Sequence, residues 1–253
     1  MIVTDLKWRD PLCEAFINAA LAFGIPFNSD YNAETQEGVS YVQRTATNMF
    51  RMSAARAFLK PALKRKNLRL IKNALVTKLI FNEDRVIGIN FQRNKRSDTI
   101  SFIGARKEVI VSGGAINSAQ LLQLSGVGPS KILLSRGIHI KRDITGVGKN
   151  LRDHLATRLT ARAKNVQTIN EMSRGIKLVK QMANYLIGRQ SILSLGPTLV
   201  YCFWHSDEMI RNADLQISFT PASYEEGKQA KLDTEPGFSL AAWQQRPESL
   251  GYV

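Results

Sequence analysis

The sequence predicts a mixed α/β protein, α+β overall, built from two parts. A β-branched run, two glycines and an apolar-periodic segment at 114–124 follow one another, which is the order strand, tight turn, helix. Two β-like runs at 74–81 and 86–92 are joined by turn residues, as in a hairpin. Three more β-like runs fall within 198–253. The pattern therefore changes near residue 150, from hairpin and strand–helix units to a mainly antiparallel arrangement.

The helical segments are indicated by their caps and by apolar periodicity. In the first of them, Asp10 is an N-cap residue type, Pro11 suits the first helical position and Gly24 is a stop signal. Pro61 marks a break or kink in the second. We expect helices at 10–24, 52–65, 114–124, 130–136 and 171–188.

The strand-like segments are short apolar or β-branched runs that lie between turn residues. Turn chemistry at 82–85 closes the hairpin, and the segments 25–37 and 137–154 are rich in turn or loop residues. We expect strands at 38–47, 68–71, 74–81, 86–92, 100–102, 109–111, 156–163, 199–204, 215–220 and 238–244.

The chain is strongly basic, with a formal net charge of +14 over 253 residues. Much of this charge lies in two clusters, Lys60–Lys72 and Arg93–Lys107. Nucleic acid, an anionic membrane surface or an anionic cofactor could each match such a charge. Neither cluster makes one long basic helix face, and no aromatic platform is interleaved with them. We therefore expect solvated basic faces and no nucleic-acid partner.

The cysteines and the hydropathy pattern bear on the compartment. Cys13 and Cys202 are distant and both flanked by apolar residues, which favours buried free thiols over a disulfide. A reducing compartment follows, so we expect a cytoplasmic protein. No apolar run is long enough to span a bilayer, and the first residues are not a secretory signal. Peripheral membrane association is left open.

The stretch 106–128 carries the strongest functional signal. Gly113 and Gly114 have no Cβ, so the turn backbone can approach a ligand closely. The helix behind them offers unpaired N–H groups and a positive dipole end, which suit a phosphate. The part of the chain before residue 150 is therefore predicted to bind a nucleotide.

Five sequence motifs, in order, resemble those of the glucose–methanol–choline (GMC) oxidoreductases, nearest to the choline-dehydrogenase-like branch. Within Gly113–Gly128, glycine stands at 113 where the family usually has alanine, and Ala119 stands where it usually has proline. The resemblance covers nearly the whole chain and is loosest over about 155–235. The five motifs are RMSAARAFL (Arg51–Leu59), NLRLIKNALVTKLIFNEDRVIGINF (Asn67–Phe91), the Gly113–Gly128 stretch, GVGKNLRDH (Gly146–His154) and RPESLG (Arg246–Gly251).

The resemblance implies an FAD-dependent enzyme that oxidises a primary alcohol, choline-like or other, to the aldehyde. A base takes the hydroxyl proton and hydride passes from carbon to flavin N5, the flavin carrying the redox chemistry. The resemblance also implies a partial FAD-binding domain at 1–150, an antiparallel α+β substrate domain at 151–240 and the start of a C-terminal segment at 241–253. The partners implied are FAD and a small-molecule alcohol; the oligomeric state is left open.

The family's G-x-G-x-x-G fingerprint, which holds the FAD pyrophosphate, does not occur in this sequence. The family's catalytic pair, a His with a second His or Asn, follows the R-P-x-S-x-G motif and has no counterpart here. We therefore expect a central fragment that lacks both ends of the family pattern and is inactive alone. Two alternatives stay open: a non-catalytic remnant or part of a split enzyme, and a basic module that binds anions, nucleic acid or a membrane surface.

The resemblance assigns cofactor-binding positions but no catalytic ones. Val76 corresponds to a strand position whose backbone contacts the FAD adenine in the family. A backbone contact tolerates any side chain, so the presence of valine is poor evidence for this role. The turn of Ser112, Gly113, Gly114 and Ala115 corresponds to the βα turn beneath the flavin. An ordinary strand valine and a tight strand–helix connection are the structural alternatives.

The remaining candidates favour structural roles. His154 follows Asp153, and such a pair could orient an imidazole, but the family's base is a different, later residue. His139 and His205 have no second ligand at metal-binding spacing, so no metal site is expected. Ser125 lies outside any G-x-S-x-G motif and reads as a helix-ending serine.

Overall fold

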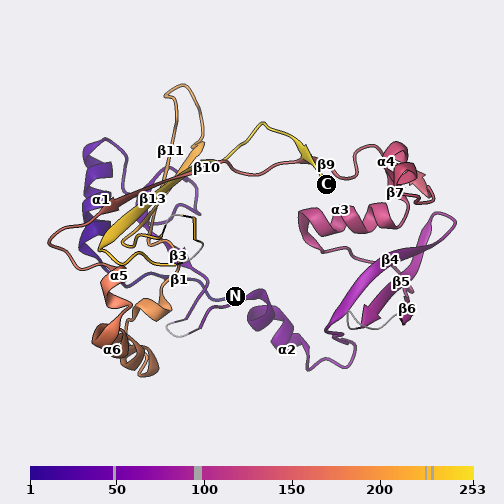
Figure 1. The fold of residues 1–253 in the computed structure, drawn as a ribbon, viewed down its shortest axis with the longest axis horizontal. Helices are drawn as coiled ribbons and strands as arrows, with labels where there is room; N and C mark the ends of the chain where they lie inside the picture. Colours follow the sequence, from indigo (N-terminus) through magenta and orange to yellow (C-terminus); the bar gives the residue numbers. More distant parts are fainter. Residues whose placement is uncertain (48–49, 94–98, 226, 229–230) are drawn as a thin grey trace. The chain divides into compact units, whose positions relative to one another are not determined.

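The computed structural model divides into two compact units, each formed from two chain segments (Figure 1). The sheet unit comprises Met1–Lys66 and His154–Pro247, and the hairpin unit comprises Asn67–Asp153 and Glu248–Val253. The assignment of 1–150, 151–240 and 241–253 to functional domains stays a prediction. The structure describes residues 1–47, 50–93, 99–225, 227–228 and 231–253, so residues 94–98 of the second basic cluster lie outside it.

The sheet unit is built on a five-stranded antiparallel sheet, as predicted for the last part of the chain. One edge strand, β2, comes from the first chain segment and pairs with β11, with Val39 opposite Cys202. The mixed class with mainly antiparallel sheets is therefore confirmed. The strand order is β10 (Ala156–Arg162), β13 (Gly237–Gln244), β12 (Leu215–Thr220), β11 (Val200–Trp204) and β2 (Gly38–Tyr41).

Helix α1 (Pro11–Ala22) packs on this sheet. The Asp10 carboxylate accepts a hydrogen bond from the Leu12 backbone N–H, which confirms the predicted N-cap. The Phe16 ring stacks on Phe219 of β12 with centroids 4.9 Å apart. The buried core between helix and sheet consists of Leu6, Cys13, Ile17, Ala20, Ile25, Val39, Val42, Leu199, Val200, Cys202 and Phe219.

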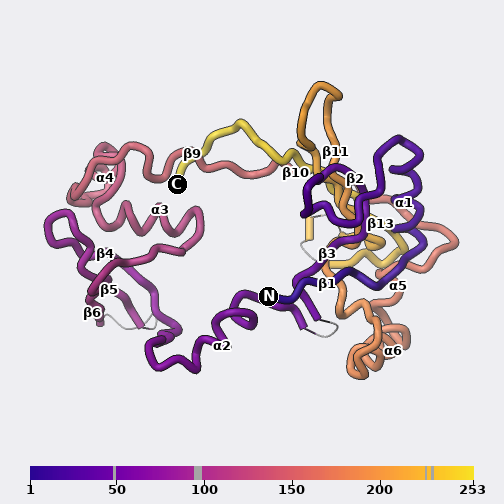
Figure 2. The backbone as a smooth tube through the Cα atoms, turned by 180° about the vertical axis from the view of Figure 1, so that it is seen from behind, coloured from indigo at the N-terminus to yellow at the C-terminus, as the bar shows by residue number. Residues whose placement is uncertain are grey.

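Two helices, α5 (Ile169–Met172) and α6 (Gly175–Leu186), occupy the predicted helix at 171–188. A capping box starts α5, because the Thr168 side chain accepts from the backbone of Glu171 and the Glu171 side chain accepts from the Thr168 N–H. Gly175, at φ 51°, stands at the start of α6. In Figures 1 and 2, α6 lies at the periphery of its unit, beyond α5.

The hairpin unit contains the antiparallel strands β4 (Ala74–Asn82), β5 (Arg85–Arg93) and β6 (Ile100–Gly104). Helix α3 (Gly114–Leu124) lies beside β4, as both views show. The predicted hairpin and the predicted helix at 114–124 are both confirmed. The rest of the unit comprises β7 (Val127–Gly128), α4 (Ser130–Ser135), β8 (Arg142–Asp143), β9 (Lys149–Leu151) and β14 (Gly251–Tyr252).

Four local predictions differ from the structure. The predicted strands at 68–71 and 109–111 are not strands, since neither run pairs with a strand in the described part of the chain. The predicted strand at 38–47 splits because its halves pair with different partners: β2 with β11, and β3 (Gln43–Arg44) with β1 (Thr4–Asp5). The helix expected at 52–65 is a π-helical turn, Ala55–Leu59, that continues into α2 (Lys60–Ala62), where Pro61 stands near the start.

The described helices contain no segment that is both long and apolar enough to cross a membrane.

Candidate functional site

The hairpin unit contains a cavity of about 320 Å³ between the hairpin, the glycine turn and helix α3. Most of its lining is aliphatic, with polar side chains from the turn and the helix. Strands β4 and β5 form one wall, and the segment 109–113 with α3 forms the other. The lining residues are Leu75, Val76, Leu79, Ile89, Val109, Ile110, Val111, Ser112, Gly113, Asn117, Gln120, Leu121 and Leu124.

The structure brings three of the five predicted cofactor-binding residues together. Val76, Ser112 and Gly113 line the same cavity. Gly114 and Ala115 start helix α3 and are outside the described lining of the cavity. The hairpin and the glycine turn, although distant in sequence, therefore face a common space. That these residues bind a cofactor stays a prediction.

Each of the two glycines in the turn has its own structural reason: close packing at Gly113 and a positive φ at Gly114. A Cβ on Gly113 would lie 3.2 Å from Asn117 Cβ and 3.3 Å from Ser118 N, so the turn packs tightly on the first turn of α3. Gly114 has a φ of +81°, which other residues adopt only with strain. The sequence predicted that the turn backbone can approach a ligand closely. The close packing that the structure shows at Gly113 is between the turn and the first turn of α3.

Val76 stands on a strand whose backbone is partly free. Strand β4 is at the edge of its three-stranded sheet, so alternate backbone groups on its outer side have no partner within that sheet. The pairing with β5 shifts register between Val76 and Lys78, which leaves Thr77 as the extra residue of a bulge. Strand pairing within this sheet therefore leaves alternate backbone groups of β4 near Val76 unused.

Ser125 fixes the distance between helix and hairpin, a role that the sequence reasoning missed. Its Oγ accepts a hydrogen bond from the Leu79 backbone N–H (2.8 Å) and donates one to the Leu121 carbonyl oxygen (2.6 Å). Ser125 is itself buried. The serine therefore does end the helix, and it also ties the helix to the edge strand that forms the opposite wall of the cavity.

The sequence reasoning also missed the polar side chains of the cavity, Asn117 and Gln120. They lie on α3 with Leu121 and Leu124, at the spacing that places residues on one helix face. This spacing counted from the glycine turn is the signal that could have found them. Amide groups on an otherwise aliphatic wall can bind the polar edge of a flat ring by hydrogen bonds.

The contacts of His154 and His205 and the burial of Phe203 are consistent with structural roles. His154 Nδ1 contacts the backbone carbonyl oxygen of Gln244, and His205 Nε2 lies 4.0 Å from Glu37 Oε1. Phe203 is buried in a small core cluster. Within the residues that the structure describes, no group of three or more His, Cys, Asp or Glu side chains could hold a metal ion.

The two cysteines are buried and free, as predicted. Burial raises the pKa of Cys202 to about 11, and burial with the nearby Asp10 and Glu14 raises the pKa of Cys13 well above its usual range. Both therefore stay as thiols at neutral pH and serve as core residues.

Comparison with known proteins identifies relatives over nearly the whole chain. A sequence profile described as GMC oxidoreductase matches residues 1–156. An oxygen-dependent choline dehydrogenase from Staphylococcus saprophyticus is 37% identical over 212 residues, which are 84% of this chain and 37% of that protein. One from Vibrio vulnificus is 35% identical over 250 residues, 96% of this chain and 43% of that protein. An alcohol dehydrogenase (acceptor) from Pseudomonas putida is 32% identical over 257 residues, 100% of this chain and 46% of that protein.

Solved structures show the same fold. An FAD-dependent oxidoreductase from Chaetomium thermophilum has a TM-score of 0.84 at 20% identity, over 99% of this chain and 49% of that one. A formate oxidase from Aspergillus oryzae has a TM-score of 0.84 at 19% identity, over 98% of this chain and 47% of that one. The fold class is therefore that found in FAD-dependent oxidoreductases.

The chain belongs to the GMC oxidoreductase family. The family predicted from the five sequence motifs is thus confirmed. The chain spans less than half the length of the curated relatives that it matches, between 37% and 46% for those named above.

Proposed function

We propose that the cavity of the hairpin unit binds the adenine end of FAD, as part of an enzyme that oxidises a primary alcohol to the aldehyde. The observation that supports this most is the shared cavity, because Val76 of the hairpin and Ser112–Gly113 of the glycine turn both line it. We therefore assign the glycine turn to the adenine end of FAD, and no longer to the flavin end that the resemblance implied. The choline dehydrogenase and alcohol dehydrogenase relatives support a small alcohol, choline-like or other, as substrate.

The cavity suits a flat aromatic ring in size and chemistry. Small-molecule pockets range from about 300 to 1,000 Å³, so a cavity of about 320 Å³ accommodates a ring system but not a whole dinucleotide. Aliphatic walls can cover the two faces of a purine. The edge-strand backbone near Val76 and the amides of Asn117 and Gln120 can bind its polar rim.

Bound FAD would supply the hydride acceptor for alcohol oxidation. The residues of this chain would orient its adenine end and keep the turn of Gly113 close to the helix. We propose that turnover needs groups which this sequence does not carry, a pyrophosphate loop and a proton-accepting His with a second His or Asn. The cytoplasmic location, expected from the two thiols, stays a prediction.

Two measurements on the purified chain test the proposal. Equilibrium dialysis measures FAD binding, and a dye-coupled assay with FAD measures alcohol oxidation. We expect saturable FAD binding without turnover of choline. Gln120→Leu should weaken binding about fivefold, since one net hydrogen bond contributes about 1 kcal/mol. Gln36→Leu, the same change at an exposed position of the sheet unit, is the matched control.

The two parts of the proposal fail separately. Absence of FAD binding by a folded chain would contradict the cavity assignment, as would equal losses in the Gln120 and Gln36 variants. Clear turnover of an alcohol with FAD alone would contradict the proposed need for further groups.

A further inference from the structure

Helix α6 presents an apolar stripe to solvent. Ile176 is 82% exposed, Val179 58%, Leu186 73% and Ile187 63%. Their spacing along the chain places them on one side of the helix. A contiguous set of long aliphatic side chains in water is an unusual surface for a helix at the margin of a compact unit.

Polar contacts help to hold the side of α6 that faces the unit. Gln181 is buried, its Oε1 accepts from the Ile192 N–H (3.0 Å), and its backbone carbonyl accepts from Ser191 Oγ (2.8 Å). Leu178 and Tyr185 on the same side are half-buried. The stripe is therefore not needed to attach the helix to its own unit, and it is free for another apolar phase.

The surroundings of the stripe are basic. The sequence from 172 to 206 contains no Asp or Glu, while Arg174, Lys177, Lys180 and Arg189 lie on or beside α6. Lys177 Nζ is 3.6 Å from the Glu171 carboxylate, and both side chains are partly exposed. The helix thus combines an exposed apolar face with flanking positive charge, the composition of helices that lie in a membrane interface.

A basic cavity of about 260 Å³ opens beside the C-terminal end of α6. It is lined by Lys7, Arg44 and Arg189, and no carboxylate side chain is among its described lining residues. Arg44 donates to the Ser194 carbonyl oxygen (2.7 Å), whereas its buried Nε has no hydrogen-bond partner among the described residues. Unmatched donors and positive charge in a cavity favour a phosphate group.

We propose that α6 docks the sheet unit on the surface of an anionic phospholipid bilayer. The stripe of Ile176, Val179, Leu186 and Ile187 enters the interface, and the cavity beside Arg189 takes a headgroup phosphate. Pairing of the stripe with a second copy is disfavoured, because it would bring the lysines at 177 and 180 of two copies together.

Co-sedimentation of the full chain with vesicles tests the proposal. We expect binding to vesicles of phosphatidylcholine mixed with phosphatidylglycerol, and much weaker binding to phosphatidylcholine alone. Ile176→Ser with Leu186→Ser should weaken binding about tenfold or more, because two exposed apolar anchors are lost. Lys177→Gln with Lys180→Gln should leave the fold intact and reduce the salt dependence of binding.

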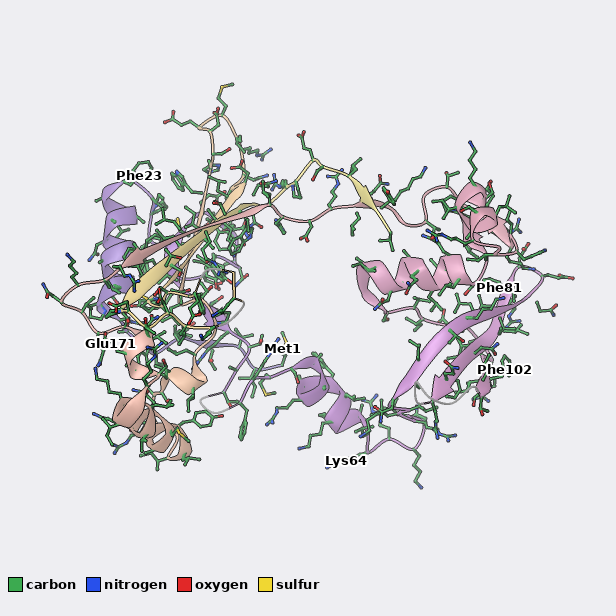
Figure 3. All side chains as sticks on the ribbon, in the orientation of Figure 1. Met1, Phe23, Lys64, Phe81, Phe102 and Glu171 are labelled. Carbon is green, nitrogen blue, oxygen red and sulfur yellow. The ribbon has the colours of Figure 1, made fainter. Side chains whose placement is uncertain are left out.

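The matched control is Phe23→Ser with Met209→Ser, which removes equally exposed apolar side chains of the same unit. Figure 3 labels Phe23 at the end of α1 that lies away from Glu171 of α5. This control should bind vesicles like the unchanged chain. Absence of binding to anionic vesicles, or equal losses in the control and the stripe variant, would overturn the proposal. So would sedimentation analysis showing a dimer that the stripe substitutions dissociate.

Discussion

Ser125 shows how one hydroxyl can set the geometry of a cavity. It accepts from the Leu79 N–H of the edge strand and donates to the Leu121 carbonyl oxygen one turn earlier in the helix. A buried backbone N–H without a partner costs about 1–3 kcal/mol, so this link also stabilises the hairpin unit.

Ser125→Ala should therefore lower the free energy of unfolding by about 1–3 kcal/mol and weaken ligand binding in the cavity. Ser135→Ala is the control, because the Ser135 hydroxyl donates to the Ile132 carbonyl oxygen at an exposed position. Urea unfolding, followed by helix circular dichroism, measures both. An equal and small effect of the two substitutions would contradict the role of Ser125.

The Asp214 carboxylate accepts two hydrogen bonds from Ser206. The Ser206 hydroxyl donates to Asp214 Oδ2 (2.6 Å) and holds the pKa of that carboxyl below its usual range, with help from the Ser206 N–H. A carboxyl with a lowered pKa in the folded state contributes stability that is fully present above its unfolded pKa of about 3.9. That stability is lost as the pH falls through the folded-state value.

We expect Asp214→Asn to reduce the fall in melting temperature between about pH 5 and about pH 2, since the variant has no proton to take up there. Thermal unfolding of both proteins at several pH values checks this. Parallel pH profiles for the unchanged chain and the variant would show that Asp214 contributes nothing to acid lability.

At the scale of elements, α5 holds the loop that follows β12 through one buried amide. Asn170 Nδ2 donates to the backbone carbonyl oxygens of Ser223 (2.9 Å) and Asp233 (3.0 Å), while its Oδ1 accepts from the Ser223 N–H (3.0 Å). Asn170 is completely buried. The amide of one helical residue thus bonds both sides of this loop, at Ser223 and at Asp233.

Asn170→Leu should destabilise the sheet unit by about 3 kcal/mol or more, because several buried backbone groups lose their partners together. Asn184→Leu, on the neighbouring helix, changes the same residue type at a half-buried position and is the control. Chemical unfolding of the two variants gives the comparison. A loss below about 1 kcal/mol for Asn170→Leu would contradict this account of the network.

Elements with strong local signals could be predicted from the sequence, and those that depend on distant partners could not. Helix α3 has the predicted bounds, because a glycine turn precedes it and Ser125 ends it. The β-branched run at 109–111 looked like a strand from its composition alone. A strand also requires a neighbour to pair with, and the described chain supplies none there.

The residues of the candidate site also divide into those that a local motif marks and those that depend on distant packing. Val76, Ser112 and Gly113 were identified from motifs, whereas Asn117 and Gln120 were missed because no motif marks them. They matter only once α3 is known to lie against β4. Their helical spacing from the glycine turn becomes informative after that packing is known.

At the scale of the whole molecule, the two compact units interleave in sequence. The strand β2, from the first 66 residues, completes the sheet of the later segment, and β14, near the chain end, pairs with β9 of the hairpin unit. The change in element pattern near residue 150 gave no sign that each unit would be formed from two separate chain segments. Long-range pairings of this kind leave no local signature in the sequence.

The hairpin unit and the sheet unit also offer different chemistry. The first has an aliphatic cavity with amide groups, and the second has an apolar stripe beside a basic cavity. We propose the first as a nucleotide site and the second as a contact with an anionic surface.

Hydrogen exchange of the full chain with ADP, and in parallel with FMN, tests adenine binding by the hairpin unit, because the two ligands carry opposite ends of FAD. We expect ADP to slow exchange in β4 near Val76 and in α3 near Asn117 and Gln120, and FMN to leave these segments unchanged. Equal protection by both ligands, or no protection of either segment by ADP in a folded chain, would contradict adenine binding there.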